Sequence, residues 1–271
     1  MSYFFEKRTL IINLRRPTLL GFLVLFLILD CCPLNASEQE VSSTSSLINI
    51  LRQGETLSYD VSWSNIVTAG IATMEAKEGT MPDGKQILRF IVKTHSVGFV
   101  NMFFPVNDTV ESVFDPEIMQ SLSFRLNETH GKKKRSRELL FDHAGRIVVS
   151  KLNDDQPETY AVPDPVQDAL SSFYYLRIKE DFTVGKTIVV DVHDSRKNWS
   201  VEVQILGKEM VKTPAGEFAT IKIRTYPKYE GVFKHKGEIF IWLTDDIRKI
   251  PVLMKSTIAI GSIVTTLTSI Q

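Results

Sequence analysis

A single helix pattern stands among segments that alternate like strands, and this imbalance limits the folds open to the chain. Residues Pro163–Glu180 (PDPVQDALSSFYYLRIKE) begin with Asp164 as an N-cap and Pro165 at the first helical position. The apolar residues of this segment recur at helical spacing, namely Val166, Ala169, Leu170, Phe173 and Tyr174. One helix near 164–179 must therefore be accommodated by a large amount of sheet.

Short segments separated by turn residues predict strands on both sides of this helix. They are Thr56–Trp63, Gly70–Lys77, Gln86–Thr94, Thr109–Phe114, Ser121–Glu128, Arg135–Phe141, Ile147–Leu152, Thr187–Val192, Trp199–Leu206, Phe218–Tyr226, Glu238–Leu243, Val252–Ile260 and Ile263–Ile270. The spacing of the turns is typical of an all-β meander.

Two kinds of strand indicate how the sheet is covered. Trp199–Leu206 alternates between apolar and polar residues, so one of its faces is expected to be wet. Ile87–Val92 is apolar on both faces and is expected to be covered twice. We therefore predict a mainly β fold: a strongly curved antiparallel sheet, open or half-barrel-like, wrapped around one central helix.

The N-terminus has the pattern of an export signal. Four basic residues (Lys7, Arg8, Arg15 and Arg16) precede the apolar run Leu19–Leu29, which is shorter than the roughly 20 residues of a membrane span. Ala36 offers a cleavage point. The predicted organisation is a signal peptide at 1–36, a flexible linker at 37–52 and one domain at 53–271, with a retained N-terminal anchor as the alternative. Leu47–Arg52 fits a helical turn leading into the domain.

Both cysteines lie just after the apolar run. Anchoring as a lipoprotein through Cys31 or Cys32 is disfavoured, because such sites have a small residue before the cysteine, whereas Asp30 precedes Cys31 and Cys31 precedes Cys32. Cleavage after Ala36 would leave a mature chain without cysteine. That mature chain would hold 28 basic and 30 acidic residues, a balance that argues against a nucleic-acid partner. The expected location is the periplasm or envelope.

Four short motifs resemble a bacterial envelope family, domain of unknown function 3108. They are Gly54–Tyr59 with Ala69–Ala72, Asp168–Arg177, Thr213–Phe218, and Ile241–Asp246 continuing through Arg248 to Pro251. The resemblance spans Gly54–Gln271 and implies an exported β-rich domain. It supplies no catalytic residues, and similarity to curved-sheet lipid carriers of the periplasm is a comparison of general build alone.

Two segments carry candidate binding residues. In Val97–Val106, the side chains of Phe99, Met102, Phe103 and Phe104 could line an apolar cavity together with Leu170, Phe173 and Tyr174 of the helix. The alternative is that the segment fills one end of the sheet as core.

The second segment is the basic stretch Gly131–Arg137 (GKKKRSR), which is expected to form a hairpin. Its basic residues are Lys132, Lys133, Lys134, Arg135 and Arg137. They could dock the protein on an anionic membrane surface, or they could simply protect a solvated sheet edge.

No recognisable motif assigns a reaction, a metal or a cofactor. The nearest approach to a metal pair is Asp191 with His193, which would share a strand face, and it lacks further ligands nearby. The sequence favours a non-catalytic exported domain that binds a lipid or other apolar ligand between sheet and helix. The alternative is an assembly protein that docks on an envelope protein through a sheet edge or the basic hairpin, and an envelope hydrolase comes third.

Overall fold

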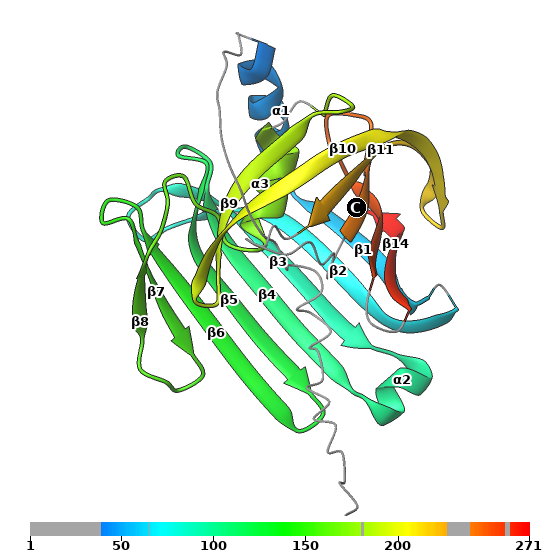
Figure 1. Ribbon diagram of the computed structural model, residues 1–271, viewed down its shortest axis with the longest axis horizontal. Helices are drawn as coiled ribbons and strands as arrows, with labels where there is room; N and C mark the ends of the chain where they lie inside the picture. The colour runs from blue at the N-terminus through cyan, green and yellow to red at the C-terminus, as the bar shows by residue number, and fades with distance from the viewer. Residues whose placement is uncertain (1–38, 65, 180–181, 227–238, 258–260) are drawn as a thin grey trace, which may run out of the picture.

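The computed structural model describes residues 39–271 except 65, 180–181, 227–238 and 258–260 (Figure 1). The predicted signal peptide at 1–36, including Cys31 and Cys32, lies outside the described residues. Within the described ranges, no helix combines the length and the apolar character needed to cross a membrane.

The described residues form fourteen strands in one antiparallel sheet. They are β1 (Glu55–Trp63), β2 (Val67–Thr80), β3 (Gln86–Ser96), β4 (Val106–Asp115), β5 (Gln120–His130), β6 (Lys133–Asp142), β7 (Ile147–Leu152), β8 (Glu158–Ala161), β9 (Thr187–Asp194), β10 (Lys197–Thr213), β11 (Gly216–Tyr226), β12 (Ile239–Thr244), β13 (Pro251–Thr257) and β14 (Ser262–Ile270). The order is β8-β7-β6-β5-β4-β3-β2-β1-β14-β13-β12-β11-β10-β9, so the first and last strands pair in the middle.

This arrangement confirms the predicted mainly β class and the antiparallel sheet. Every predicted strand overlaps an observed one, although Glu238 and residues 258–260 lie outside the described residues. Strand β8 was missed, since its four residues are too short for a clear alternation. The sheet is not closed into a barrel: β8 and β9 are its two edges.

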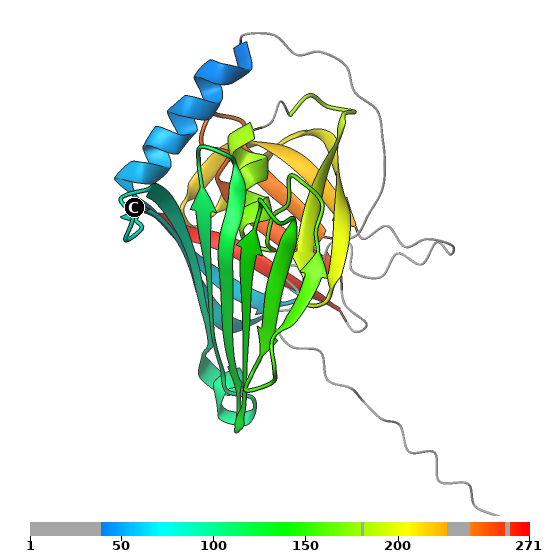
Figure 2. The ribbon, with the colours of Figure 1, turned by 90° about the vertical axis from the view of Figure 1, so that its left-hand side faces the viewer.

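Helix α3 (Ser171–Lys179) lies inside the curve of the sheet (Figures 1 and 2). It begins seven residues later than Asp164, the predicted N-cap. The carboxylate of Asp168 caps the helix instead, because its Oδ1 accepts the backbone N–H groups of Leu170 at 2.7 Å and Ser171 at 2.8 Å. Residues 171–178 are buried except for half-buried Phe173, so the helix is enclosed on all sides rather than along one apolar stripe.

The described residues form two further helices, of which only the helical turn Leu47–Arg52 was predicted. Helix α1 (Gln39–Gln53) occupies most of the segment expected to be a flexible linker, and it packs against β2 and α3. Leu47 and Leu51 are buried in the core, which explains why this polar, serine-rich segment is ordered as a helix. The short helix α2 (Gly98–Phe103) connects β3 to β4 at the opposite end of the sheet (Figure 2).

Candidate functional site

The predicted apolar site combined residues that lie in different parts of the molecule. Leu170 and Tyr174 are buried, and the ring of Tyr174 stacks on Phe90 with centroids 3.7 Å apart. The cavity beside α3, lined by Phe173, Leu176 and residues of the facing strands, has a volume of about 10 Å³, barely enough for one water. Leu170, Phe173 and Tyr174 therefore act as core residues that hold α3 in the sheet.

The other half of that predicted site lies on α2, at the far end of the sheet (Figure 1). Phe99, Met102 and Phe103 are 70%, 77% and 70% exposed, and no residue of α2 is buried. The interpretation of this segment as core is therefore wrong. Phe104 is half-buried, and its ring centroid lies 6.0 Å from that of His130.

The basic segment forms the turn and first strand residues of the β5–β6 hairpin, as predicted. Lys132, Lys133, Lys134 and Arg135 are exposed. Arg137 departs from the prediction: it is 9% exposed, and its guanidinium lies 2.7 Å from Asp194 Oδ1. The charge of Arg137 is thus buried and balanced, so it does not belong to an exposed docking surface.

The aromatic segment and the basic hairpin meet. The backbone N–H of Gly131 in the hairpin donates to the carbonyl of Pro105 at 2.8 Å, directly after α2. Between them lies a pocket of about 650 Å³, lined by Phe103 and Phe104 on one side and by the hairpin residues 131–135 on the other. We call the exposed side chains of Phe99, Met102, Phe103 and Lys132–Arg135 the tip surface, and the cavity the tip pocket.

Buried titratable groups adjoin the tip pocket. His130 Nε2 lies 2.8 Å from Asp108 Oδ2, while Asp108 Oδ1 accepts the backbone N–H of Thr129 at 3.0 Å. Glu128, paired with Asp108 across β4 and β5, is 5% exposed. Burial raises the pKa of the Glu128 carboxyl, the Arg135 guanidinium opposes this and Asp108 adds to it, so the net shift is upward.

This cluster was not predicted from the sequence. The available signal was Glu128 followed by His130 two residues later, the spacing that drew attention to Asp191 and His193. His193 is buried against β8, with Nδ1 2.7 Å from Asn198 Oδ1 and its ring 5.6 Å from that of Tyr160. Among the described residues, Asp191 and His193 belong to no group of three metal ligands.

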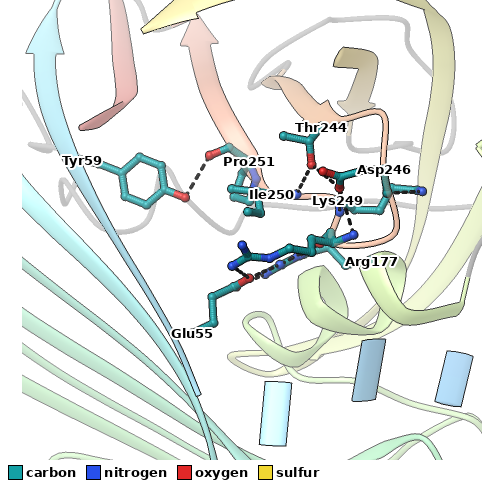
Figure 3. A network of polar contacts seen from close by, with 9 residues as sticks. Glu55, Tyr59, Arg177, Thr244, Asp246, Lys249, Ile250 and Pro251 are labelled. Atoms are coloured by element: carbon teal, nitrogen blue, oxygen red, sulfur yellow. Dashed lines mark hydrogen bonds and ion pairs between the residues drawn. The ribbon is translucent and has the colours of Figure 1, made fainter. Parts of the chain in front are cut away.

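A second polar cluster joins three of the sequence motifs. Arg177 of α3 pairs with Glu55 at the start of β1, with Nη1 2.9 Å from Oε1 and Nη2 3.0 Å from Oε2 (Figure 3). The same guanidinium donates to the carbonyl of Arg248 at 2.9 Å, in the β12–β13 loop. Burial lowers the pKa of Arg177, but the Glu55 carboxylate outweighs it and the net shift is upward. Both side chains are fully enclosed, so this cluster is structural.

The solved structures that match this one include the following three. A β-barrel-like protein of the domain of unknown function DUF1849 from Brucella abortus has a TM-score of 0.53 at 12% identity, covering 80% of this chain and 97% of that chain. A provisionally assigned lipoprotein from Parabacteroides distasonis has a TM-score of 0.30 at 10% identity, covering 80% and 95%. A provisionally assigned exported protein with a YmcC-like fold from Bacteroides fragilis has a TM-score of 0.28, with the same identity and coverage.

The Brucella likeness concerns the fold alone. No curated protein sequence matches this chain significantly. Residues 58–268, most of the chain, match the family model described as Protein of unknown function (DUF3108). The chain therefore belongs to this family, DUF3108.

Proposed function

We propose that this chain is an exported, non-catalytic protein that docks on anionic lipid surfaces through the tip surface. The single observation that carries this proposal is the meeting of an exposed aromatic helix and a basic hairpin around the tip pocket. Aromatic side chains partition into the interfacial layer of a membrane, and lysines beside them are attracted to anionic headgroups. The export-signal pattern in residues 1–36 supports a location where such surfaces occur.

The chemistry of the tip surface matches a headgroup layer better than an enclosed lipid site. Phe99 and Phe103 lie with ring centroids 4.6 Å apart and remain mostly exposed, which leaves a large apolar area in water. Each lysine near an anionic membrane contributes about 1 kcal/mol. Lys132, Lys133 and Lys134 together would contribute about 3 kcal/mol, roughly two orders of magnitude in affinity. The cavity beside α3, of about 10 Å³, is too small to enclose a lipid.

Vesicle sedimentation tests this proposal. The parent protein is expected to sediment with vesicles that contain phosphatidylglycerol, to remain in solution with phosphatidylcholine alone, and to be released as salt is added. Replacing Lys132, Lys133 and Lys134 by glutamine should abolish sedimentation at low salt. The matched control replaces Lys77, Lys197 and Lys212 by glutamine. These lysines are exposed elsewhere on the molecule, so this variant should sediment like the parent.

A second variant separates the apolar contribution from the charge. Phe99→Ser with Phe103→Ser keeps every lysine, and it should be released from the vesicles at a lower salt concentration than the parent, because mainly the electrostatic attraction, which salt screens, remains. Equal sedimentation of the parent and the triple lysine variant would overturn the proposal. Failure of the parent to bind any anionic vesicle would overturn it as well, and would favour a protein partner for this surface.

A further inference from the structure

Three metal-ligating side chains converge beside the tip pocket. Asp108, Glu128 and His130 each offer one ligand atom, and these atoms all lie within 4.8 Å of one another. The β4–β5 register places Asp108 opposite Glu128, and His130 follows Glu128 by two residues on the same strand face. Asp108 is 0% exposed and the His130 side chain 10%, so the group is built into the sheet rather than scattered over the surface.

Within the described residues, one carboxylate oxygen of Glu128 has no hydrogen-bond partner. Glu128 is 5% exposed, and its Oε2 is buried without a donor. The nearest cation is Arg135 Nη1 at 3.8 Å, which is beyond hydrogen-bonding distance. A carboxylate oxygen buried in this way is unfavourable, and a coordinated cation would supply the missing interaction.

We propose that Asp108, Glu128 and His130 bind a divalent transition-metal ion, with Zn²⁺ as the best fit. One imidazole with two carboxylates suits zinc, whereas an imidazole ligand does not suit Mg²⁺ or Ca²⁺. At bond lengths of about 2.0–2.1 Å, tetrahedral ligand atoms lie ~3.3 Å apart, so Asp108 Oδ2 and His130 Nε2, now 2.8 Å apart, need only a small displacement. The two carboxylates balance the charge of the ion.

The position of the cluster leaves one side of the ion accessible. Glu128 and His130 both line the tip pocket, so a fourth position on the ion would face the pocket and take water or an external oxygen ligand. The three candidate ligands differ from the exposed side chains that would contact lipid, although residues of both sets border the tip pocket. Metal binding can therefore be measured without vesicles.

The experiment uses untagged, metal-free protein and two probes. Zn²⁺ affinity is measured by competition with a chromogenic chelator, and Co²⁺ is added as a spectroscopic substitute. The parent is expected to bind one zinc ion per chain and to give the intense visible spectrum of Co²⁺ in a four-coordinate site. Glu128→Gln and His130→Asn should each lower zinc affinity by more than about 100-fold, the upper end of the loss for an outer-shell partner.

The matched control is His95→Asn. His95 lies near the same end of the sheet, on neighbouring β3, but its side chain is exposed. This variant should keep both the affinity and the Co²⁺ spectrum, and circular dichroism checks that all three variants fold. The absence of zinc binding by the parent, or an affinity that neither Glu128→Gln nor His130→Asn changes, would overturn the proposal.

Discussion

The guanidinium of Arg177 connects three segments that are distant in sequence. It pairs with Glu55 from the first strand and donates to the carbonyl of Arg248 from the β12–β13 loop. Hydrogen bonds within that loop hold this carbonyl in place: Thr244 Oγ1 donates to Asp246 Oδ1 at 2.7 Å, and Arg248 N donates to the same oxygen at 2.9 Å (Figure 3). The network therefore fixes how α3 sits inside the sheet.

Breaking this buried pair is expected to be costly. Glu55→Gln leaves the Arg177 charge uncompensated, and it should lower the free energy of unfolding by about 3–5 kcal/mol. Urea unfolding or thermal melting measures the loss. The control is Glu138→Gln, which removes an exposed partner of Arg125 and should cost less than about 1 kcal/mol. Similar losses in the two variants would contradict a stabilising role for the network.

At the scale of elements, α1 shows how a polar segment is recruited into the core. The helix buries only a few apolar side chains, Leu47 and Leu51 completely and Ile48 and Ile50 in part. Arg52 adds an exposed ion pair to Glu78 of β2 at 3.4 Å. An isolated helix of this length is marginal in water, so its order depends on contacts with β2 and α3.

Leu51→Ala distinguishes a packed helix from a flexible linker. If Leu51 is packed in the core, this substitution should lower the free energy of unfolding by about 2–5 kcal/mol, because it leaves a cavity. Asn49→Ala, on the exposed side of the same helix, should leave the melting temperature nearly unchanged. If Leu51→Ala melts like the parent, α1 does not contribute to the folded core.

At the scale of the whole molecule, side chains join the two edges of the sheet, between which the described residues form no backbone ladder. Arg137 of β6 pairs with Asp194 at the end of β9, and Asn198 Nδ2 donates to the carbonyl of Ala161 in β8 at 2.7 Å. Ser150 Oγ adds a hydrogen bond to the carbonyl of Ser195 at 3.2 Å. These contacts tie the turn between β9 and β10 to β6, to β7 and to the end of β8.

Arg137→Gln tests whether these side-chain contacts hold the two edges of the sheet together. It should lower the free energy of unfolding by up to about 3 kcal/mol and speed amide exchange in β8 and β9, because Asp194 loses its buried partner. Vesicle sedimentation should be unchanged, since Arg137 is not on the tip surface. Arg125→Gln, on the exposed face of β5, is the stability control. Unchanged amide exchange in both β8 and β9 would show that these side-chain contacts do not hold the two edges together.

Local sequence patterns were sufficient to predict most of the strands. Alternation along Trp199–Leu206 and turn residues such as Asp115-Pro116 act over a few residues, so they predict a strand without knowledge of its neighbours. The exposed lysines of the β5–β6 hairpin were also predicted from the local sequence. The start of α3 could not be predicted in this way. Its capping residue, Asp168, is held by Ser112 of β4 and Ser121 of β5, whose hydroxyls donate to its buried carboxylate.

The sequence by itself determined the β class, the antiparallel meander, and the presence of an aromatic segment and a basic hairpin. Only the tertiary structure decided that these two segments meet, that Asp108 lies beside Glu128 and His130, and that Arg137 is buried while Phe99 is not. The physical reason is that strand register and the pairing of β1 with β14 arise from contacts between residues far apart in the chain. A periodic pattern records which way a side chain points along its own strand, but not which side chain lies opposite.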